Sequence, residues 1–220
     1  MLNNINSFEN ATLVKFGHYN HICQLRDEGL LYMNNLLYFW GVEDENLRGD
    51  QFDGVSKIAR GNSGTVTSKS DTDNPLHVTN WVIRLHPDHP EKINVFCMNA
   101  VRPSFSSFPI DERNFRFGDY ALILTNPQEF IDRISTHLNV HKIKGKAGLV
   151  EYVSNDYTGE FGPFKKLDSF AYQSEWRLVC FDGNGEERVL SIGSIQDFCI
   201  VVKSNEANNT ISKLLNVDLI

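Results

Sequence analysis

The chain has 220 residues, of which 41% are hydrophobic and 22% are charged, and its net charge is −7. These values are ordinary for a globular protein and leave room for one large domain with a sizeable core. The acidic balance argues against broad, sequence-independent binding of nucleic acid, although a local basic groove is compatible with it.

Cysteines and apolar runs bear on the cellular compartment. The four cysteines show no C-x-x-C spacing, so we expect reduced, buried thiols. No basic-then-apolar leader opens the chain, and no apolar run approaches the roughly 20 residues that a membrane helix needs. We therefore expect a cytoplasmic protein without a membrane partner.

The first forty residues predict strand, helix and strand in succession. Residues 12–16 predict a short strand, and residues 20–29 predict a short amphipathic helix that ends at Gly29. The apolar run over residues 30–40 is interrupted by Asn34-Asn35, which predicts a strand and a second apolar segment around a turn.

The next stretch, residues 41–79, is acidic and then rich in Gly, Ser and Thr. Polar loops of this length are uncommon in compact domains and are often functional or mobile where they occur. We expect a mobile loop over about residues 55–79. The greatest mobility is expected between Gly61 and Asp73, which offer almost nothing apolar for packing.

Strands and helices follow one another irregularly over the rest of the chain. Asn126 and Pro127 open the most regular predicted helix, because apolar residues recur after them at helical spacing. A hairpin turn is predicted at residues 182–185, and a short helix is predicted from about Ala207 to Leu215. The predicted strands are residues 81–85, 94–100, 117–124, 140–153, 176–181, 189–192 and 198–202.

Many short strands and few helices predict a single α+β domain over residues 11–220, with a mostly antiparallel sheet and a flexible N-terminus over residues 1–10. The G-x-G-x-x-G and G-x-x-x-x-G-K-[ST] phosphate-binding motifs are both missing, so a doubly wound dehydrogenase and a P-loop NTPase are not supported. The pairs His18/His21 and His86/His89 lack further ligands at metal-binding spacing, and we expect no metal site.

The late strand carries three polar residues at a period of two. Gln173, Glu175 and Arg177 share one face, while Trp176 and Leu178 lie on the opposite face and are expected to pack into the core. An amide, a carboxylate and a guanidinium would then line up where a ligand can reach them. The alternative is a surface ion pair between Glu175 and Arg177 on a half-exposed strand.

Five short motifs occur in a fixed order, and their residues are Lys15-Phe16, Leu37-Tyr38-Phe39, Arg48-Gly49-Asp50-Gln51-Phe52-Asp53-Gly54, Gly118-Asp119-Tyr120-Ala121 and Tyr172-Gln173-Ser174-Glu175-Trp176-Arg177. Together, over roughly residues 13–203, they resemble an uncharacterised bacterial domain family associated with toxin and phage-defence systems. The resemblance implies a biological context, with an antitoxin as a possible partner. It does not imply a reaction.

Two segments of the sequence indicate which reaction the protein would catalyse. Gln173-Ser174-Glu175 precedes a strand, and the segment from Phe16 to Leu30 holds a Gly-His turn and a helix that ends in Gly-Leu. Both resemble elements of mono-ADP-ribosyltransferases, which have a split, mostly antiparallel sheet and use NAD. The resemblance implies that Glu175 and Gln173 are catalytic. It implies that the residues that bind NAD are Phe16, Gly17, His18, Tyr120 and Arg177. The middle Ser/Thr motif of these enzymes is not clear, and its candidates are Ser104, Tyr120 and Thr125.

The chemistry explains these residue types. Breaking the bond between nicotinamide and ribose builds positive charge on the sugar, so a carboxylate such as Glu175 that faces this charge lowers the barrier. An amide two residues earlier, Gln173, can contact the incoming nucleophile without being ionised. His18 would hold the adenosine ribose, and Phe16 or a nearby tyrosine would stack on the nicotinamide ring.

Two other functions stay open. A non-catalytic recognition module would bind a partner through the polar face of the late strand. A nuclease would hold Mg²⁺ between Asp50, Asp53 and Glu175, although these carboxylates are not compactly spaced in the sequence.

Gln two residues before the Glu implies, by the same resemblance, an acceptor with a neutral amide or a base, and a nucleobase is the favoured expectation. A nucleic-acid acceptor needs cations around Glu175, whereas cations scattered over the surface would favour a protein acceptor. The cations expected to form the groove are Arg48, Arg60, Lys69, Arg102, Arg113, Arg116, Lys165, Lys166 and Arg177.

Overall fold

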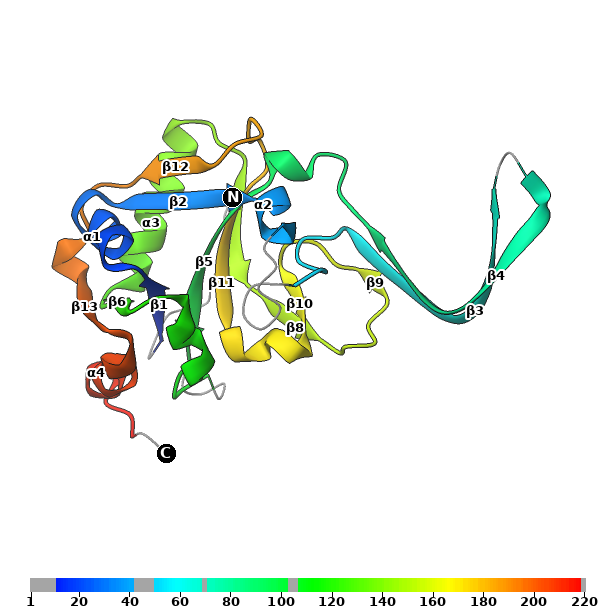
Figure 1. Ribbon diagram of the computed structural model, residues 1–220. Helices are drawn as coiled ribbons and strands as arrows, with labels where there is room; N and C mark the ends of the chain where they lie inside the picture. Colours follow the sequence, from blue (N-terminus) through cyan, green and yellow to red (C-terminus); the bar gives the residue numbers. More distant parts are fainter. Residues whose placement is uncertain (1–10, 42–49, 69–70, 103–106, 219–220) are drawn as a thin grey trace.

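The computed structural model describes residues 11–41, 50–68, 71–102 and 107–218 (Figure 1). Residues 1–10, for which a flexible terminus is expected, lie outside this range, as do Arg48, Lys69 and Ser104 of the sequence-based expectations. The described chain forms one α+β body from which a single β-hairpin projects. A mostly antiparallel sheet with a few short helices is thereby confirmed.

The strands are β1 Thr12–Gly17, β2 Leu30–Asn35, β3 Lys57–Ser68, β4 Asp71–Leu85, β5 Asn94–Val101, β6 Tyr120–Leu124, β7 Gly145–Leu149, β8 Glu151–Val153, β9 Gly159–Glu160, β10 Lys165–Leu167, β11 Glu175–Cys180, β12 Arg188–Ser191 and β13 Cys199–Lys203. The α-helices are α1 Tyr19–Glu28, α2 Leu36–Trp40, α3 Pro127–Val140 and α4 Ala207–Leu215. Short 3₁₀ helices include η1 Pro90–Lys92, η3 Glu112–Phe117, η4 Asp168–Gln173, η5 Gln196–Phe198 and η6 Ser204–Glu206.

Strand β5 divides the large eight-stranded sheet. On one side β5 pairs with β11 from Asn94 to Asn99. On its other side β5 pairs with β2 at its start and with β1 at its end, so the sheet splits into a β2–β12 branch and a β1–β6–β13 branch. The Lys15 ammonium fills the point of divergence, where it donates to the Cys97 carbonyl at 2.7 Å. All pairs in this sheet are antiparallel.

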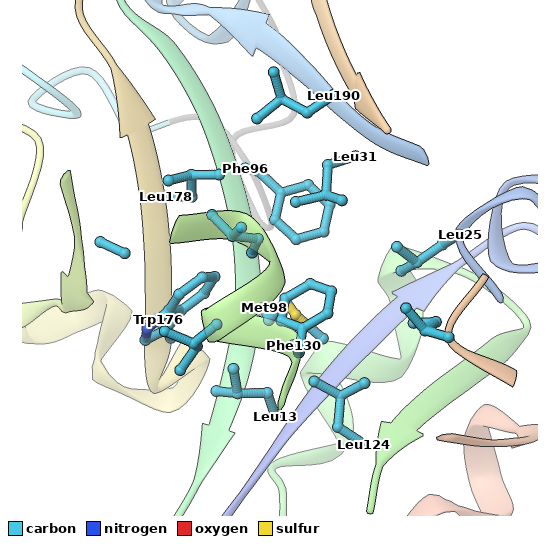
Figure 2. Close-up of a cluster of buried hydrophobic side chains, with 14 of the residues drawn as sticks. Leu13, Leu25, Leu31, Phe96, Met98, Leu124, Phe130, Trp176, Leu178 and Leu190 are labelled. Atoms are coloured by element: carbon cyan, nitrogen blue, oxygen red, sulfur yellow. The ribbon is translucent and has the colours of Figure 1, made fainter. Parts of the chain in front are cut away.

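Apolar side chains from the sheet and from α1 and α3 form the main core. Figure 2 shows Leu13, Met98 and Trp176, from three different strands, gathered around Phe130 of α3. The helix α3 forms as predicted, because the Asn126 side chain accepts from the Glu129 amide at 3.1 Å and Pro127 stands in its first turn. The opposite face of the sheet is covered near β1 and β6 by α4, and near β5 and β11 by α2 and the segments before β3 and β11.

A long β-hairpin occupies most of the segment for which a polar loop is expected. β3 and β4 pair in one register from Lys57↔Leu85 to Val66↔Leu76 and extend away from the body (Figure 1). The sequence looks like a loop because neither face of the distal hairpin is buried, so polar and apolar residues do not alternate there. The expectation of a loop is therefore wrong for its backbone structure, while its mobility stays a prediction.

Candidate functional site

The late polar strand begins where a helical turn ends. η4 closes at Gln173, Ser174 takes a left-handed conformation with φ 41°, and Glu175 is the first residue of β11. Glu175 and Arg177 share one face of β11, while Trp176 and Leu178 pack into the main core, as their period of two predicts. The expected strand and the expected alternation of its side chains are thus both present, although Gln173 belongs to η4 and not to the strand.

Glu175 and Arg177 belong to a network of four charged side chains. The two Glu175 oxygens accept from Lys166 Nζ and Arg177 Nε, each at 2.7 Å. Arg177 also holds both oxygens of Asp53 at 2.6 and 2.9 Å. Gln173 joins this network through its amide oxygen, which accepts from Lys166 Nζ at 2.6 Å. Two anions and two cations thus satisfy one another directly.

The network is buried, which corrects the expectation of a half-exposed polar face. Relative exposure is 8% for Glu175, 3% for Gln173, 1% for Arg177 and 4% for Lys166. The cover comes from two other segments: Asp53 lies before β3, far from β11 in the sequence, and Lys166 lies in the nearby strand β10. A surface ion pair between Glu175 and Arg177 is therefore excluded.

The charges of the network determine the protonation states of its side chains. Burial alone would raise the pKa of Glu175, but the charges and hydrogen bonds of Arg177 and Lys166 outweigh it and lower that pKa well below its usual range. Burial would lower the pKa of Lys166, but Glu175 and Asp53 outweigh it and raise that pKa. Glu175 is therefore a carboxylate and Lys166 an ammonium at neutral pH.

A second carboxyl group, Asp50, lies beside the network in a different state. Burial, reinforced by the charge of Asp53, raises its pKa to about 6. One Asp50 oxygen accepts from the Phe52 amide at 2.8 Å, while the other is buried without a hydrogen-bond partner. Asp50 is thus poised to gain a proton in mildly acidic solution.

Glu175 is one of the residues that line an open cleft of about 920 Å³. The cleft lies where β5 and β11 meet η3 and η4, and its volume is in the range of small-molecule sites. Its lining residues are Asn99, Arg102, Ser107, Pro109, Ile110, Asp111, Glu112, Arg113, Val150, Tyr152, Asp168, Ser169, Ala171, Tyr172, Ser174, Glu175 and Asn208.

Two further polar side chains lie beside Glu175 in this cleft. The Tyr152 hydroxyl accepts from the Glu175 amide at 2.9 Å, which leaves its own proton to be donated. Burial and the charge of Glu175 raise the pKa of Tyr152, so the phenol stays protonated. Asn99 pairs with Glu175 across the strands and donates to the Gln173 carbonyl at 2.7 Å, whereas its amide oxygen is buried without a partner.

A rigid wall closes one side of the cleft. The Arg113 guanidinium lies over the Tyr172 ring, 3.8 Å from its centroid. Asp111 fixes Arg113 through two hydrogen bonds of 2.9 and 2.7 Å, and Asn114 ties η3 to η4 by donating to the Tyr172 carbonyl at 2.8 Å. The wall therefore presents to a ligand a flat guanidinium stacked on a ring, with its charge paired to Asp111.

The predicted site residues fall into two separate groups. Gln173, Glu175 and Arg177 lie together, whereas the residues from the other predicted segment do not line the cleft. In the sheet, β1 and β5 separate β6 from β11, which places Tyr120 roughly 14 Å from β11 at about 4.8 Å per strand. The other group comprises Phe16, Gly17, His18 and Tyr120.

This second group lies around the junction of β1 and α1. His18 is exposed and precedes α1, and Gly17 pairs with Tyr120. The Tyr120 ring contacts that of Tyr19 at 4.8 Å, and the Phe16 ring contacts that of Phe115 at 5.7 Å. An NAD-binding role for this group stays a prediction.

The cations that were expected to form a groove around Glu175 do not gather there. Of those that the structure describes, Arg102 and Arg113 line the cleft, while Lys166 and Arg177 are buried beneath it. Arg60 lies in the hairpin, Arg116 is an exposed residue of η3 that does not line the cleft, and Lys165 in β10 pairs with Glu151. The described residues therefore do not form a continuous basic groove beside Glu175.

Sequence reasoning did not single out Tyr152 and Asn99, or the pairing of Asp53 and Lys166 with the late strand. Asp53 carries a usable signal, because it belongs to the Arg48–Gly54 motif quoted with the late strand. Tyr152 and Asn99 carry none, since a single tyrosine or asparagine in a strand is common. Their importance depends on which strands become neighbours.

Comparison with family models, curated proteins and solved structures gives no match for this chain. The fold and site therefore define its class: an α+β domain with a split antiparallel sheet and a buried ion network below an open cleft. Within the described ranges, no helix is long and apolar enough to span a membrane. No cluster of three or more metal-binding side chains occurs within the same ranges.

Proposed function

We propose that the chain is an NAD-dependent mono-ADP-ribosyltransferase and that its reaction takes place in the cleft above Glu175. One observation carries the proposal. A carboxylate that stays ionised stands at the floor of a ligand-sized cleft, at the turn where η4 gives way to β11. The resemblance of Gln173-Ser174-Glu175 to the corresponding transferase element gives this carboxylate its role.

The proposed role of Glu175 is electrostatic. Each Glu175 oxygen accepts one hydrogen bond from the network, one from Lys166 and the other from Arg177. A carboxylate oxygen has two lone pairs, so each keeps one that these bonds do not use. Its cleft-facing edge is therefore available to the ribose as the nicotinamide leaves with the bonding electrons and the acceptor nucleophile forms the new bond. Because the network holds the carboxylate rigid, little reorganisation accompanies this charge development.

Other residues of the cleft would orient the dinucleotide. Tyr152 donates its hydroxyl proton to the ligand, and Arg113 offers charge to a phosphate and a flat surface to a ring. Gln173 positions Lys166 in this arrangement, because its amide oxygen is already committed to that ammonium. This role replaces the direct contact with the acceptor that the sequence alone favours.

The acceptor is proposed to be a protein. A nucleic-acid acceptor needs several cations along its backbone, and Arg102 and Arg113 are the two predicted cations that line the cleft. The motif order that resembles toxin and defence domains supports an effector role and does not decide between the two kinds of acceptor.

Nicotinamide release from NAD, measured with the full chain and its Tyr152→Phe variant, tests the proposal. We expect turnover by the wild type and a loss of roughly 10²-fold or more in Tyr152→Phe, in the range found for single electrostatic donors. Tyr38→Phe, an exposed tyrosine of α2, is the matched control and should retain full turnover. A wild type that neither turns over NAD nor gains thermal stability with it would defeat the proposal.

A non-catalytic recognition module is the second candidate. The observation in its favour is that Glu175, Arg177, Lys166 and Asp53 satisfy one another, as a purely structural network would. Binding of NAD without turnover, together with unchanged affinity in Tyr152→Phe, would favour this function. Turnover that depends on Tyr152 would exclude it.

A further inference from the structure

The β3–β4 hairpin projects from the body and plays no part in the cleft (Figure 1). Its root is firmly held: Ile58 is fully buried in a small core with Val55, Phe161 and Leu167. Within the described chain, β9 pairs with β3 only at Lys57 and Ile58. Beyond this root the hairpin is a two-stranded ribbon, a structure that is at best marginally stable in water by itself.

The ribbon exposes several large apolar side chains to solvent. Val66 and Leu76 lie opposite each other near its tip and are 53% and 64% exposed. Val82, Ile83 and Leu85 are also largely exposed nearer the root. Val66, Leu76 and Val82 lie on one face of the ribbon, and Ile83 and Leu85 lie on the other. Single exposed apolar residues are ordinary, but several on one projecting element indicate that the ribbon has a binding partner.

The charge of the ribbon indicates the class of partner. The hairpin has four cations, but Lys57, Arg60 and Arg84 stand at its root and interact with residues of the body, which leaves Lys69, with the anions Asp71 and Asp73, in the distal part between residues 61 and 81. Arms that bind nucleic acid carry several cations for its phosphates, and this segment does not. The covering surface is therefore that of a protein.

The two edges of the ribbon differ in what they can accept. The outer edge of β4 contains Pro75, which has no amide proton, and Asn80, whose left-handed φ of 51° distorts the strand. The outer edge of β3 has no proline from residue 59 to residue 67, and β9 already pairs with its first two residues. Additional strand pairing would therefore take place along β3.

A second copy of this chain fits that edge. In a two-fold dimer of antiparallel β3 strands, residue i of one copy faces residue j of the other and j faces i, so both members of every cross-strand pair come from the same segment. Residues 61–68 contain no charged side chain, although the chain as a whole carries a net charge of −7. The free edge of β3, residues 59–68, is also about 33 Å long at 3.3 Å per residue, which is long enough for a continuous ladder of backbone hydrogen bonds.

We propose that the chain forms a two-fold dimer in which the β3 edges of two arms pair and make a continuous four-stranded sheet. Val66 of each copy then lies on an inner strand of this sheet, between its own β4 and the β3 strand of the other copy, whereas Leu76 lies on an outer strand. The dimer joins the arms and leaves both clefts open, so it does not depend on the proposed enzymatic function.

Sedimentation of the full chain over a range of concentrations tests the proposal, with two double variants that add the same charge. Ser63→Lys with Thr65→Lys alters β3, and Thr79→Lys with His77→Lys alters the paired positions of β4 on the same face. We expect a wild-type dimer, a dissociation constant raised at least about tenfold by the β3 variant, and little change in the β4 variant.

Each other outcome would overturn the proposal. A wild type that stays monomeric up to about 100 µM lacks the dimer. Equal weakening by both variants would mean that a face of the ribbon makes the contact and not the β3 edge. A dimer that neither variant affects would lie elsewhere on the body. Binding of labelled DNA or RNA that the β3 variant abolishes would identify nucleic acid as the partner.

Discussion

At the scale of single residues, the buried network around Glu175 determines what a substitution there reports. Removing one partner of a buried ion pair leaves an uncompensated charge and typically costs about 3–5 kcal/mol. Glu175→Gln would leave Lys166 with a weaker acceptor, so a loss of activity in that variant would be mixed with a loss of stability. Tyr152→Phe avoids this, because it removes no charge.

The coupling between Glu175 and Lys166 is itself testable. We expect Glu175→Gln and Lys166→Met to lower the free energy of unfolding by about 3–5 kcal/mol each. The double variant should lose clearly less than the sum, because it leaves fewer unpaired charges behind. Denaturant unfolding of the four proteins measures this, and additive losses would show that the pair is not energetically coupled.

Asp50 predicts a pH dependence of stability. Its pKa is about 6 in the folded protein and 3.8 as the reference value, so the folded state binds more protons between these values. The stability that this carboxyl group contributes is complete below pH 3.8 and is lost as the pH rises through about 6. Two pKa units correspond to about 3 kcal/mol.

The Asp50→Asn variant isolates this effect from other titrating groups. Relative to the wild type, we expect the variant to gain about 3 kcal/mol of stability between pH 4 and pH 7. Glu175 acts in the opposite direction at lower pH, because its pKa is depressed, but it is present in both proteins and cancels in the difference. Unfolding curves at several pH values test this, and a constant difference would contradict it.

Sequence periodicity correctly predicted which residues of the candidate site share a face, but it did not predict what surrounds them. The period of two correctly placed Glu175 and Arg177 on one face, with Trp176 and Leu178 in the core. It did not reveal that this face is covered, because the covering residue Asp53 comes from 124 positions away along the chain. Burial of this kind is a tertiary property without a local signal.

At the scale of elements, Gly29 joins α1 to β2 by a turn that only glycine fits. Its φ is 64°, and a Cβ atom would lie 2.1 Å from the Gly193 carbonyl oxygen. The Gly29 amide donates to the Leu25 carbonyl at 3.1 Å, and its own carbonyl accepts from Ile192 at 3.1 Å. The helix end is thus bound directly to the segment after β12.

A pair of alanine substitutions separates backbone strain from this close approach. Gly193 has a φ of 76°, and no atom of the described chain lies within 4 Å of the position that a methyl group would take there. Gly193→Ala should therefore cost about 1–2 kcal/mol from its left-handed conformation alone. Gly29→Ala should cost at least about 2 kcal/mol more, because its methyl group overlaps backbone atoms. Equal losses in thermal or denaturant unfolding would contradict the structure of this junction.

Elements defined by local signals were predicted well, and those defined by tertiary pairing were not. α3 is capped and amphipathic in the sequence and forms as predicted. The turn predicted at residues 182–185 does not make a hairpin, because β11 pairs with β5 and β7 while β12 pairs with β2. Gly183 instead donates to the Lys92 carbonyl at 2.9 Å, which directs the chain to another part of the sheet.

At the scale of the whole molecule, the body and the projecting β3–β4 hairpin, here called the arm, differ in how they can be stabilised. Strands β5 and β11 pair along their length and contact apolar cores on both faces. The distal arm has one partner strand and two faces without a core, so its opening exposes little additional apolar surface. Its stability in a monomer is therefore local, whereas that of β5 and β11 is shared with the entire domain.

Hydrogen exchange measures this difference and its dependence on concentration. In dilute protein, we expect amides of residues 61–68 to exchange far faster than those of β5 and β11, because local opening of a two-stranded ribbon costs little free energy. At concentrations that favour the proposed dimer, the same amides should become protected while those of β5 stay unchanged, since pairing along β3 adds hydrogen bonds only there. Fast exchange at every concentration would agree with a mobile arm and would contradict the proposed dimer. Protection equal to that of β5 in dilute monomer would contradict the mobile arm itself.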